Sequence, residues 1–428
     1  MPAPAPSYWQ ASAPPFAGGA AGPVEGDFDV AVIGAGFTGL SAARSLAKAG
    51  ASVAVLEAGK VIGAASGRNG GQCNAGTAHD FGALSASLGL DRARALYLAH
   101  CDAVDTVERI AREEAIDCAF TRCGRAKLAA KPRHFDKLAA AYEVLVREVD
   151  PHVSLVPPER IGEEVVSAEF HGALVQRTSA QLHVGRFGVG LAGAAARAGA
   201  AIWEDAAAEG LARQGDAWQV RTAGGTLRAK QVLVATGGAA PQAPFGWFRR
   251  RIVSVGSFAI STAPLPADLV QALFPARRNY VTSRIIGNYF RLTEDNRLIF
   301  GGRARFALSD PVSDLKGADV LEAAMRRMFP VLSGVPVEHR WGGTVDLTAD
   351  RLPRAGEHDG LFYAMGYSGH GVQMATHMGE CMARVMGGDA GANPLAVLAW
   401  PAIPGHIVGK PWFLPMVGAW YRLQDWLH

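Results

Sequence analysis

A glycine motif at the junction of a strand and a helix limits what this chain can fold into more than any other feature. Residues 28–33 are apolar and rich in β-branched side chains, as expected for a strand buried in a parallel sheet. Gly34-x-Gly36-x-x-Gly39 follows, then a helical pattern, then a second apolar stretch that ends at Glu57. This strand–helix–strand order is the repeating unit of parallel sheets, so the sequence predicts an α/β fold.

The spacing of this motif predicts that it binds a dinucleotide. Gly34 permits a tight turn, Gly36 lets the backbone approach a pyrophosphate, and Gly39 lets the helix pack close to the sheet. The N-terminus of that helix then faces the phosphates. Glu57 stands where a carboxylate accepts hydrogen bonds from ribose hydroxyls. For the glycines alone, a purely structural turn is the alternative.

Further glycine-rich stretches favour FAD over NAD as the dinucleotide. The loop GAASGRNGGQCNAG, residues 63–76, directly follows the second strand, where a nicotinamide enzyme of the open doubly wound type would continue with another helix. An apolar strand leads into ATGG at 235–238, and GYSGHG at 366–371 opens another helix. Glycine-lined contacts so far apart in the chain suit a large ligand that lies extended through the domain.

Size, charge and cysteine content exclude several classes of protein. A chain of 428 residues exceeds the usual size of a single core, so two domains are expected. Its net charge of +3 argues against a nucleic-acid partner. The five cysteines lack the spacing of a metal site or a disulfide framework, which favours a reducing, cytoplasmic location and no metal. Six prolines in residues 1–26, without the apolar core of a signal peptide, predict an extended arm rather than a helix.

Two later segments carry local predictions. NYFRLTEDNRLIFGG, residues 288–302, alternates on both sides of TEDN and predicts a hairpin. Tyr289 and Arg291 share one face of its first strand and Phe290 lies on the other, and the alternation does not tell which face meets the cofactor. The aromatic-rich residues 410–428 are expected to pack on the body of the protein, with contact to a membrane surface as the less favoured alternative.

Together these motifs resemble the D-amino-acid oxidase superfamily of flavoproteins, and within it the bacterial gamma-glutamylputrescine oxidase group. The resemblance covers nearly the whole chain. It is carried by these stretches: SYWQAS, VIGAGFTGLSAARSLAKAGASVAVLEAG, GAASGRNGGQ, AQLHVGRF, NYFRLTEDNRLIFGGR, RWGGTVDLTADRLPRAG and GYSGHGVQMA.

The resemblance implies an α/β, more closely α+β, protein of two domains. One is a discontinuous Rossmann-like FAD-binding domain of the glutathione-reductase type, and the other is a substrate domain with a mainly antiparallel sheet over the flavin. The expected boundaries are an arm at 1–26, the FAD-binding domain at 27–95, 155–245 and 335–390, the substrate domain at 96–154 and 246–334, and a C-terminal tail at 391–428.

The resemblance also assigns residues to a non-covalent FAD. They are Gly34, Gly36, Phe37, Thr38, Gly39, Glu57, Ala58, Ser66, Gly67, Arg68, Asn69, Gly70, Gly71, Gln72, Ala208, Ala235, Thr236, Gly237, Gly369, His370, Gly371, Val372 and Gln373. The last five open a helix toward the pyrimidine end of the flavin, and a helix N-terminus stabilises the negative charge of the reduced ring.

Two departures from the family pattern affect the expected chemistry. Related amino-acid oxidases carry an arginine that clamps the substrate carboxylate where this chain has Val345, so an amine without an adjacent carboxylate is the expected substrate. Relatives that attach flavin covalently carry cysteine or histidine where this chain has Gly343 and Asn69, so FAD is expected to bind non-covalently.

Four residues are candidates for roles beside the reacting amine: His370, Tyr289, Arg291 and Asp346. Asp346 could attract a substrate ammonium or serve a structural role, and His370 could carry a proton or only position the backbone.

The sequence therefore predicts a cytoplasmic FAD-dependent amine oxidase. A hydride passes from the α-carbon of the amine to flavin N5, water hydrolyses the imine to an aldehyde, and O2 reoxidises the flavin and yields hydrogen peroxide. The alternatives are a dehydrogenase that passes electrons to a quinone or carrier, and a dinucleotide-binding protein without catalysis. The oligomeric state is not predicted.

Overall fold

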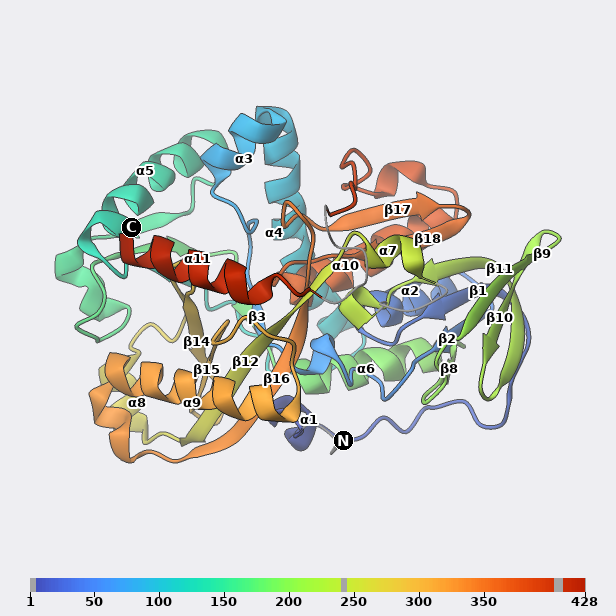
Figure 1. The fold of residues 1–428 in the computed structure, drawn as a ribbon, viewed down its shortest axis with the longest axis horizontal. Helices are drawn as coiled ribbons and strands as arrows, with labels where there is room; N and C mark the ends of the chain where they lie inside the picture. Colours follow the sequence, from blue (N-terminus) through green and yellow to red (C-terminus); the bar gives the residue numbers. More distant parts are fainter. Residues whose placement is uncertain (1–4, 240–244, 404–410, 428) are drawn as a thin grey trace.

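The computed structural model describes residues 5–239, 245–403 and 411–427. The ends of the predicted arm and tail, and residues 240–244 and 404–410, lie outside the described residues. Two eight-stranded sheets organise the molecule, and Figure 1 shows them in opposite halves of the view.

The first sheet contains the glycine motif and is mostly parallel. Its strands run in the order β17 (Arg354–His358), β18 (Leu361–Met365), β11 (Gly225–Val234), β1 (Val24–Ile33), β2 (Val53–Leu56) and β8 (Ala201–Trp203), with β10 (Ala217–Thr222) and β9 (Gly210–Gln214) added as an antiparallel extension of β11. β1 pairs in parallel with both β2 and β11. The parallel α/β architecture predicted from the motif is confirmed.

Helices cover one face of this sheet. They are α2 (Phe37–Lys48), α6 (Val184–Arg197) and α10 (Gly371–Met386), and the long α4 (Leu90–Glu113) packs against α10. Their apolar faces and the sheet form the largest core, while Trp203, Trp218 and Tyr363 contribute to a separate core on the other face of the sheet. A strand such as β2 is apolar at all four positions because both of its faces are buried.

The second sheet is antiparallel except where β4 pairs with β13. Its strands run in the order β16 (Val337–Leu347), β12 (Val253–Pro264), β15 (Arg297–Gly302), β14 (Asn288–Leu292), β13 (Asn279–Thr282), β4 (Arg125–Leu128), β6 (Ala173–Gln176) and β5 (Ser154–Val156). β14 and β15 form the predicted hairpin. One face of the sheet packs on α9 (Pro311–Met328) and α8 (Ala267–Leu273) through an aromatic core that includes Phe258, Phe290 and Phe300.

Sheet membership does not follow the predicted domain boundaries everywhere. β5, β6 and β16 belong to the second sheet, although residues 155–176 and 337–347 were expected in the FAD-binding domain. The chain therefore crosses between the sheets inside these segments, and the division into domains stays a prediction.

The expectation of a wholly extended arm is wrong at its centre. Residues 8–12 form a short helix, α1 (Tyr8–Ser12), which begins with a capping box between Ser7 and Gln10. Trp9 is completely buried and Tyr8 nearly so. The prolines lie on both sides of this turn rather than inside it, and burial of the two rings stabilises it.

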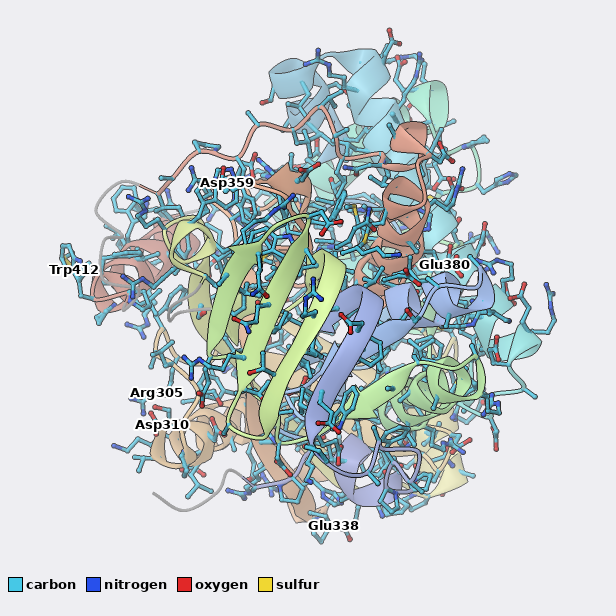
Figure 2. All side chains as sticks on the ribbon, turned by 90° about the vertical axis from the view of Figure 1, so that its right-hand side faces the viewer. Arg305, Asp310, Glu338, Asp359, Glu380 and Trp412 are labelled. Carbon is cyan, nitrogen blue, oxygen red and sulfur yellow. The ribbon has the colours of Figure 1, made fainter. Side chains whose placement is uncertain are left out.

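At the other end of the chain, α11 (Leu414–Leu427) lies across the half of the molecule that holds the second sheet (Figure 1). The Asp425 carboxylate accepts hydrogen bonds from the backbone amides of Ile285 and Ile286, each at 2.8 Å, so the helix is anchored to the body. Several large apolar side chains stay outside, including Trp412 (69% exposed) and Trp426 (78% exposed). Figure 2 shows Trp412 at the edge of the molecule. Among the described residues, no helix is both long and apolar enough to cross a bilayer.

Candidate functional site

The glycine motif has the close backbone contacts that explain its residue types. Gly34 has φ of +107°, and a Cβ there would lie 2.7 Å from the carbonyl oxygen of Ala235 at the end of β11. A Cβ on Gly39 would lie only 1.9 Å from the Gly34 carbonyl oxygen. Only glycine fits at either position, so β1, β11 and the first turn of α2 meet at one point.

Glu57 lies at the carboxyl end of β2 and faces this junction. Its Oε2 accepts a hydrogen bond from the Ala35 amide at 2.7 Å, and its Oε1 accepts one from Gly59 at 2.9 Å. Burial raises the pKa of the carboxyl. The Ala206 amide donates to the Glu57 carbonyl, so the segment that leads to Ala208 passes this corner, while Ala58 is exposed.

The loop of residues 63–76 is attached to the start of α2. The Phe37 amide donates to Ser66 Oγ at 3.1 Å, and a Cβ on Gly36 would lie 2.9 Å from the same oxygen. Thr38 Oγ1 and the Tyr367 hydroxyl are 2.7 Å apart, so the glycine-rich turn of residues 366–371 also contacts α2. The structure therefore brings together the glycine motif, the loop of residues 63–76 and the turn of residues 366–371, all predicted to hold the dinucleotide.

The structure also shows which face of the hairpin meets the loop. A Cβ on Gly70 would lie 2.4 Å from the Tyr289 ring, and one on Gly71 would lie 2.6 Å from the Arg291 guanidinium. Phe290 points the other way, into the core shared with α9. Burial raises the pKa of Tyr289, so its phenol keeps its proton over the ordinary pH range.

Arg291 holds the loop rather than facing an acid. Its Nε donates to the Gly70 carbonyl at 3.1 Å and its Nη2 to the Leu182 carbonyl at 2.9 Å. The guanidinium lies over the Trp9 ring at 4.9 Å, and burial lowers its pKa to about 10. Arg291 therefore positions the loop and α1, and it stays charged at neutral pH.

Arg68 and Asn69, in the middle of the loop, make hydrogen bonds to other parts of the protein. Arg68 donates to the Gly342 carbonyl on β16, to Gln10 Oε1 at 3.0 Å and to the Ala5 carbonyl at 2.9 Å. The side-chain amide of Asn69 donates to the Ser66 carbonyl at 2.8 Å. The backbone carbonyl of Asn69 accepts a hydrogen bond from the Trp9 indole N–H at 2.6 Å. Both residues fix the loop between β16 and α1.

The helix α10 begins at Gly371, with His370 as its N-cap and no side chain capping its first amides. Gln373 in the first turn donates through Nε2 to the Asn74 carbonyl, while its buried Oε1 has no partner among the described residues. The His370 ring stacks on His100 at 5.9 Å. Burial, together with Arg125 and Arg303, lowers the pKa of His370 to about 3, so the ring is neutral above that pH.

Asp346 and Val345 occupy different environments on β16. Asp346 accepts a hydrogen bond from the Gly366 amide at 2.6 Å and lies beside Gly237, so its carboxylate holds the glycine-rich turn of residues 366–371. Burial raises its pKa to about 6. Val345 shares a face with Trp341, whose indole N–H donates to the Arg68 carbonyl at 3.0 Å. Gly343, on the same face, lies beside Arg68, so alternation places the apolar side chain of Val345 on the face of β16 that meets the loop.

These residues fit FAD. The free amides at the start of α10 suit the negative charge of a reduced flavin. The orphaned Gln373 Oε1 can accept from an N–H such as the one on the flavin pyrimidine ring. Thr236 Oγ1, at the end of β11, is likewise buried and unpartnered within the described chain. Glu57 Oε2 accepts from the Ala35 amide and, as a carboxylate oxygen, can accept a second hydrogen bond from a ribose hydroxyl.

Two features at or beside this site were missed from the sequence. The S-x-x-Q pattern at Ser7 and Gln10 is a capping-box signal for α1, but the prolines around it favoured an extended arm. Arg125 and Lys127 alternate with Ala126 and Leu128 on β4, and this period-2 pattern places both cations on the face away from the α9 core.

A dinucleotide corner built from three chain segments, with a second sheet closing over a glycine-lined loop, defines a flavoprotein oxidoreductase. The comparison with protein families agrees: residues 29–385 match the model of the FAD dependent oxidoreductase (DAO) family. The chain belongs to this family and is an FAD-dependent oxidoreductase.

Relatives within the family include amine and amino-acid oxidoreductases. Gamma-glutamylputrescine oxidoreductase of Escherichia coli is 33% identical over 400 residues, covering 93% of this chain and 92% of that protein. Glycine oxidase of Geobacillus kaustophilus is 26% identical, covering 83% and 92%. The crystal structure of glycine oxidase from the same organism superimposes with a TM-score of 0.72 at 23% identity, over 84% of this chain and 95% of that one. The predicted fold class is confirmed.

Proposed function

We propose that this protein oxidises an amine with no carboxylate beside the reacting carbon, of the gamma-glutamylputrescine kind, and that O2 is its electron acceptor. The observation that carries the proposal is Val345. It stands on the face of β16 that meets the cofactor loop, where an aliphatic side chain packs against an alkyl chain but cannot pair with a carboxylate. The similarity to gamma-glutamylputrescine oxidoreductase supports the same substrate class.

FAD supplies the hydride acceptor when it is bound. The chain positions the reactants: Arg291 holds the loop through the Gly70 carbonyl, and the Tyr289 phenol, whose ring lies beside Gly70, keeps its proton. The neutral His370 brings no charge to the start of α10, so its amides remain the main source of positive potential there. An amine that arrives deprotonated needs no protein base, and catalysis rests on positioning and electrostatics.

An amine panel tests the proposal. Gamma-glutamylputrescine, putrescine, an N-methyl amine and glycine are supplied to the flavin-loaded enzyme, and hydrogen peroxide and oxygen consumption are measured together. Oxidation of the first substrate with stoichiometric peroxide supports the proposal. Activity confined to glycine or D-amino acids contradicts the argument from Val345.

A gain-of-function variant sharpens this test. Val345→Arg introduces the missing guanidinium at the same strand position, so glycine oxidation should rise while oxidation of gamma-glutamylputrescine falls. Val337→Arg, at the opposite end of the same strand and packed against the core shared with α9, is the matched control and should not create glycine oxidation.

The exposed apolar side chains of α11 favour a second candidate, an amine dehydrogenase that passes electrons to a membrane quinone. Trp426 is the most exposed large apolar side chain of this helix, and Trp412, two residues before the helix begins, is exposed as well. Tryptophan is a residue typical of membrane interfaces. Amine turnover that reduces a water-soluble quinone but consumes no oxygen would replace the first candidate with the second.

A further inference from the structure

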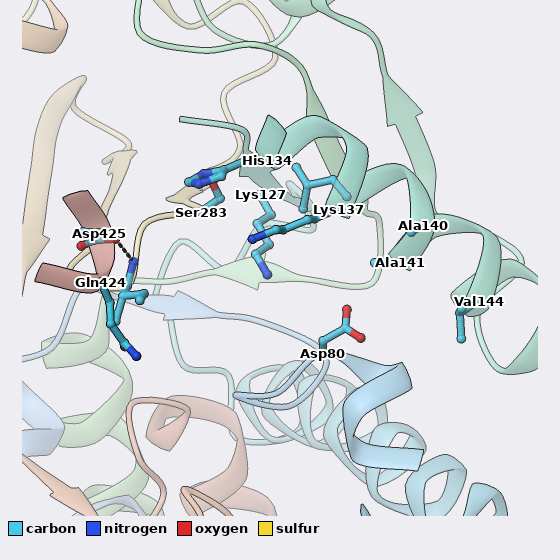
Figure 3. A pocket seen from close by; sticks show the side chains of 12 residues that line it. Asp80, Lys127, His134, Lys137, Ala140, Ala141, Val144, Ser283, Gln424 and Asp425 are labelled. Atoms are coloured by element: carbon cyan, nitrogen blue, oxygen red, sulfur yellow. Dashed lines mark hydrogen bonds between the residues drawn. The ribbon is translucent and has the colours of Figure 1, made fainter. Parts of the chain in front are cut away.

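A pocket of about 570 Å³ lies beside the second sheet and takes no part in the cofactor site. It is bounded by the start of α3 (Phe81–Leu88), by α5 (Pro132–Glu148), by β4 and by the end of α11. Its volume is in the usual range for a small-molecule site. Figure 3 shows Lys127, Lys137 and Asp80 around the same space.

The charges in the pocket wall are not all satisfied by the protein. Asp425 uses both carboxylate oxygens on the Ile285 and Ile286 amides. Among the described residues Asp80 uses only Oδ1, which caps α3 through the Gly82 amide at 3.0 Å, so Oδ2 has no partner there. Within the described chain, Lys127 makes no hydrogen bond or close ion pair, and burial lowers the pKa of its ammonium. A partly buried cation and a free carboxylate oxygen therefore face one pocket.

The register of the second sheet connects this pocket with the reacting end of the site. Val281 on β13 is paired with Tyr289 on β14 and with Lys127 on β4. The three residues form one cross-strand row, so Tyr289 and Lys127 point to the same side of the sheet. Neighbouring strands are about 4.8 Å apart, which puts Lys127 about 10 Å from Tyr289 along the sheet. Tyr289 itself packs against Gly70 of the cofactor loop.

We propose that this pocket binds a zwitterionic amino-acid group at the far end of the substrate. The carboxylate pairs with Lys127 and the ammonium with Asp80, while the amine to be oxidised lies beside Tyr289. The inference rests on the proposed function and specifies its substrate: a primary amine joined to an α-amino acid by an extended spacer of about 10 Å, close to the reach of three residues of extended chain.

The geometry also explains why the missing clamp at Val345 does not leave an anionic substrate unrecognised. The clamp of a small amino-acid oxidase must stand next to the reacting carbon, whereas Lys127 stands two strands away from Tyr289. Arg125, on the same face of β4, has a buried Nε without a partner in the described chain and adds positive potential along this row. The enzyme then selects the distal carboxylate rather than a proximal one.

Three substrates and two variants test the pocket. Gamma-glutamylputrescine carries both charges, N-glutarylputrescine lacks the ammonium, and N-(4-aminobutanoyl)putrescine lacks the carboxylate. Lys127→Met should lower kcat/KM for the two carboxylate-bearing amines by about 10- to 100-fold, mainly through KM, because a hydrogen bond to a charged group is lost. It should leave the third amine unchanged. Asp80→Asn, which keeps an oxygen to cap α3, should affect only the ammonium-bearing pair.

Controls separate this inference from the proposed function. Lys316→Met, at an exposed position of α9, should change none of the three activities. Calorimetry with the non-oxidisable gamma-glutamyl-n-butylamide measures the pocket without turnover, and Lys127→Met should weaken its binding by the same factor. Equal effects of Lys127→Met on all three amines, or no effect on the butylamide, overturn the inference. An enzyme that binds the butylamide but oxidises no amine overturns the proposed function and leaves the pocket standing.

Discussion

The arm helix α1 should be part of the cofactor site rather than a surface attachment, and Trp9→Ala tests this. Trp9 is fully buried, donates its indole N–H to the Asn69 carbonyl at 2.6 Å, and lies beneath the Arg291 guanidinium. Truncation of a buried tryptophan costs about 3–5 kcal/mol. For 428 residues the unfolding entropy is about 0.9 kcal/mol per degree, so the Tm should fall by about 4 °C.

The same truncation should also weaken FAD binding. Without the indole, the Asn69 carbonyl loses its donor and Arg291 loses its support on one side, so the loop must be ordered by the cofactor itself. If ordering the loop takes about 1.4 kcal/mol from the binding free energy of FAD, the Kd for FAD rises tenfold, and we expect at least that change. Trp9→Phe keeps the ring and should show most of the loss in FAD affinity with a smaller change in Tm.

Apo-protein titrated with FAD, followed by flavin fluorescence, gives the Kd, and thermal unfolding of the same samples gives the Tm. Trp412→Ala is the matched control because this indole is 69% exposed, and both quantities should stay at their wild-type values. A Trp9→Ala protein that binds FAD with unchanged Kd would refute the view that α1 supports the loop.

Three further predictions concern the cofactor corner and its pH dependence. Gly39→Ala should yield protein without flavin, since its Cβ would meet the Gly34 carbonyl at 1.9 Å, whereas Gly246→Ala, which meets open space, should keep a full flavin spectrum. The folded state holds the Asp346 proton with a pKa of about 6, above its unfolded value, so this group makes stability fall as pH rises between about 4 and 6; Asp346→Asn should therefore gain Tm relative to wild type above pH 6 but not at pH 4. Acid precipitation should release all of the flavin into the supernatant because Asn69 offers no nucleophile, and yellow colour in the pellet would show a covalent bond.

The parts of the fold that local pattern determines were predictable. The junction of β1 and α2 follows from steric demands at Gly34 and Gly39, and the hairpin follows from alternation around its turn. Which face of the hairpin meets the cofactor loop was not predictable, because Tyr289 and Phe290 are both aromatic. Only the position of the core shared with α9 decides that Phe290 points into it.

The remaining gaps have the same origin in long-range packing. The helical turn at Tyr8 depends on a buried site made by residues far along the chain, although its capping box was readable at Ser7. The sheet that β6 joins was not predictable, because its apolar residues Ala173, Leu174 and Val175 suit a strand in either sheet. The role proposed for Lys127 depends on its register with Val281, which no local pattern contains.

The meeting of Thr38 with Tyr367 has a consequence for how the protein is made. The glycine motif leaves the ribosome early, but β11 and the helix that closes the site are translated some 190 to 350 residues later, roughly 10–70 s at 5–20 residues per second. During that interval β1 lacks its partner β11 and the first turn of α10 is missing, so we expect the nascent chain not to retain FAD. Cofactor loading should then be a late step, and a chain that stops before α10 should emerge without flavin.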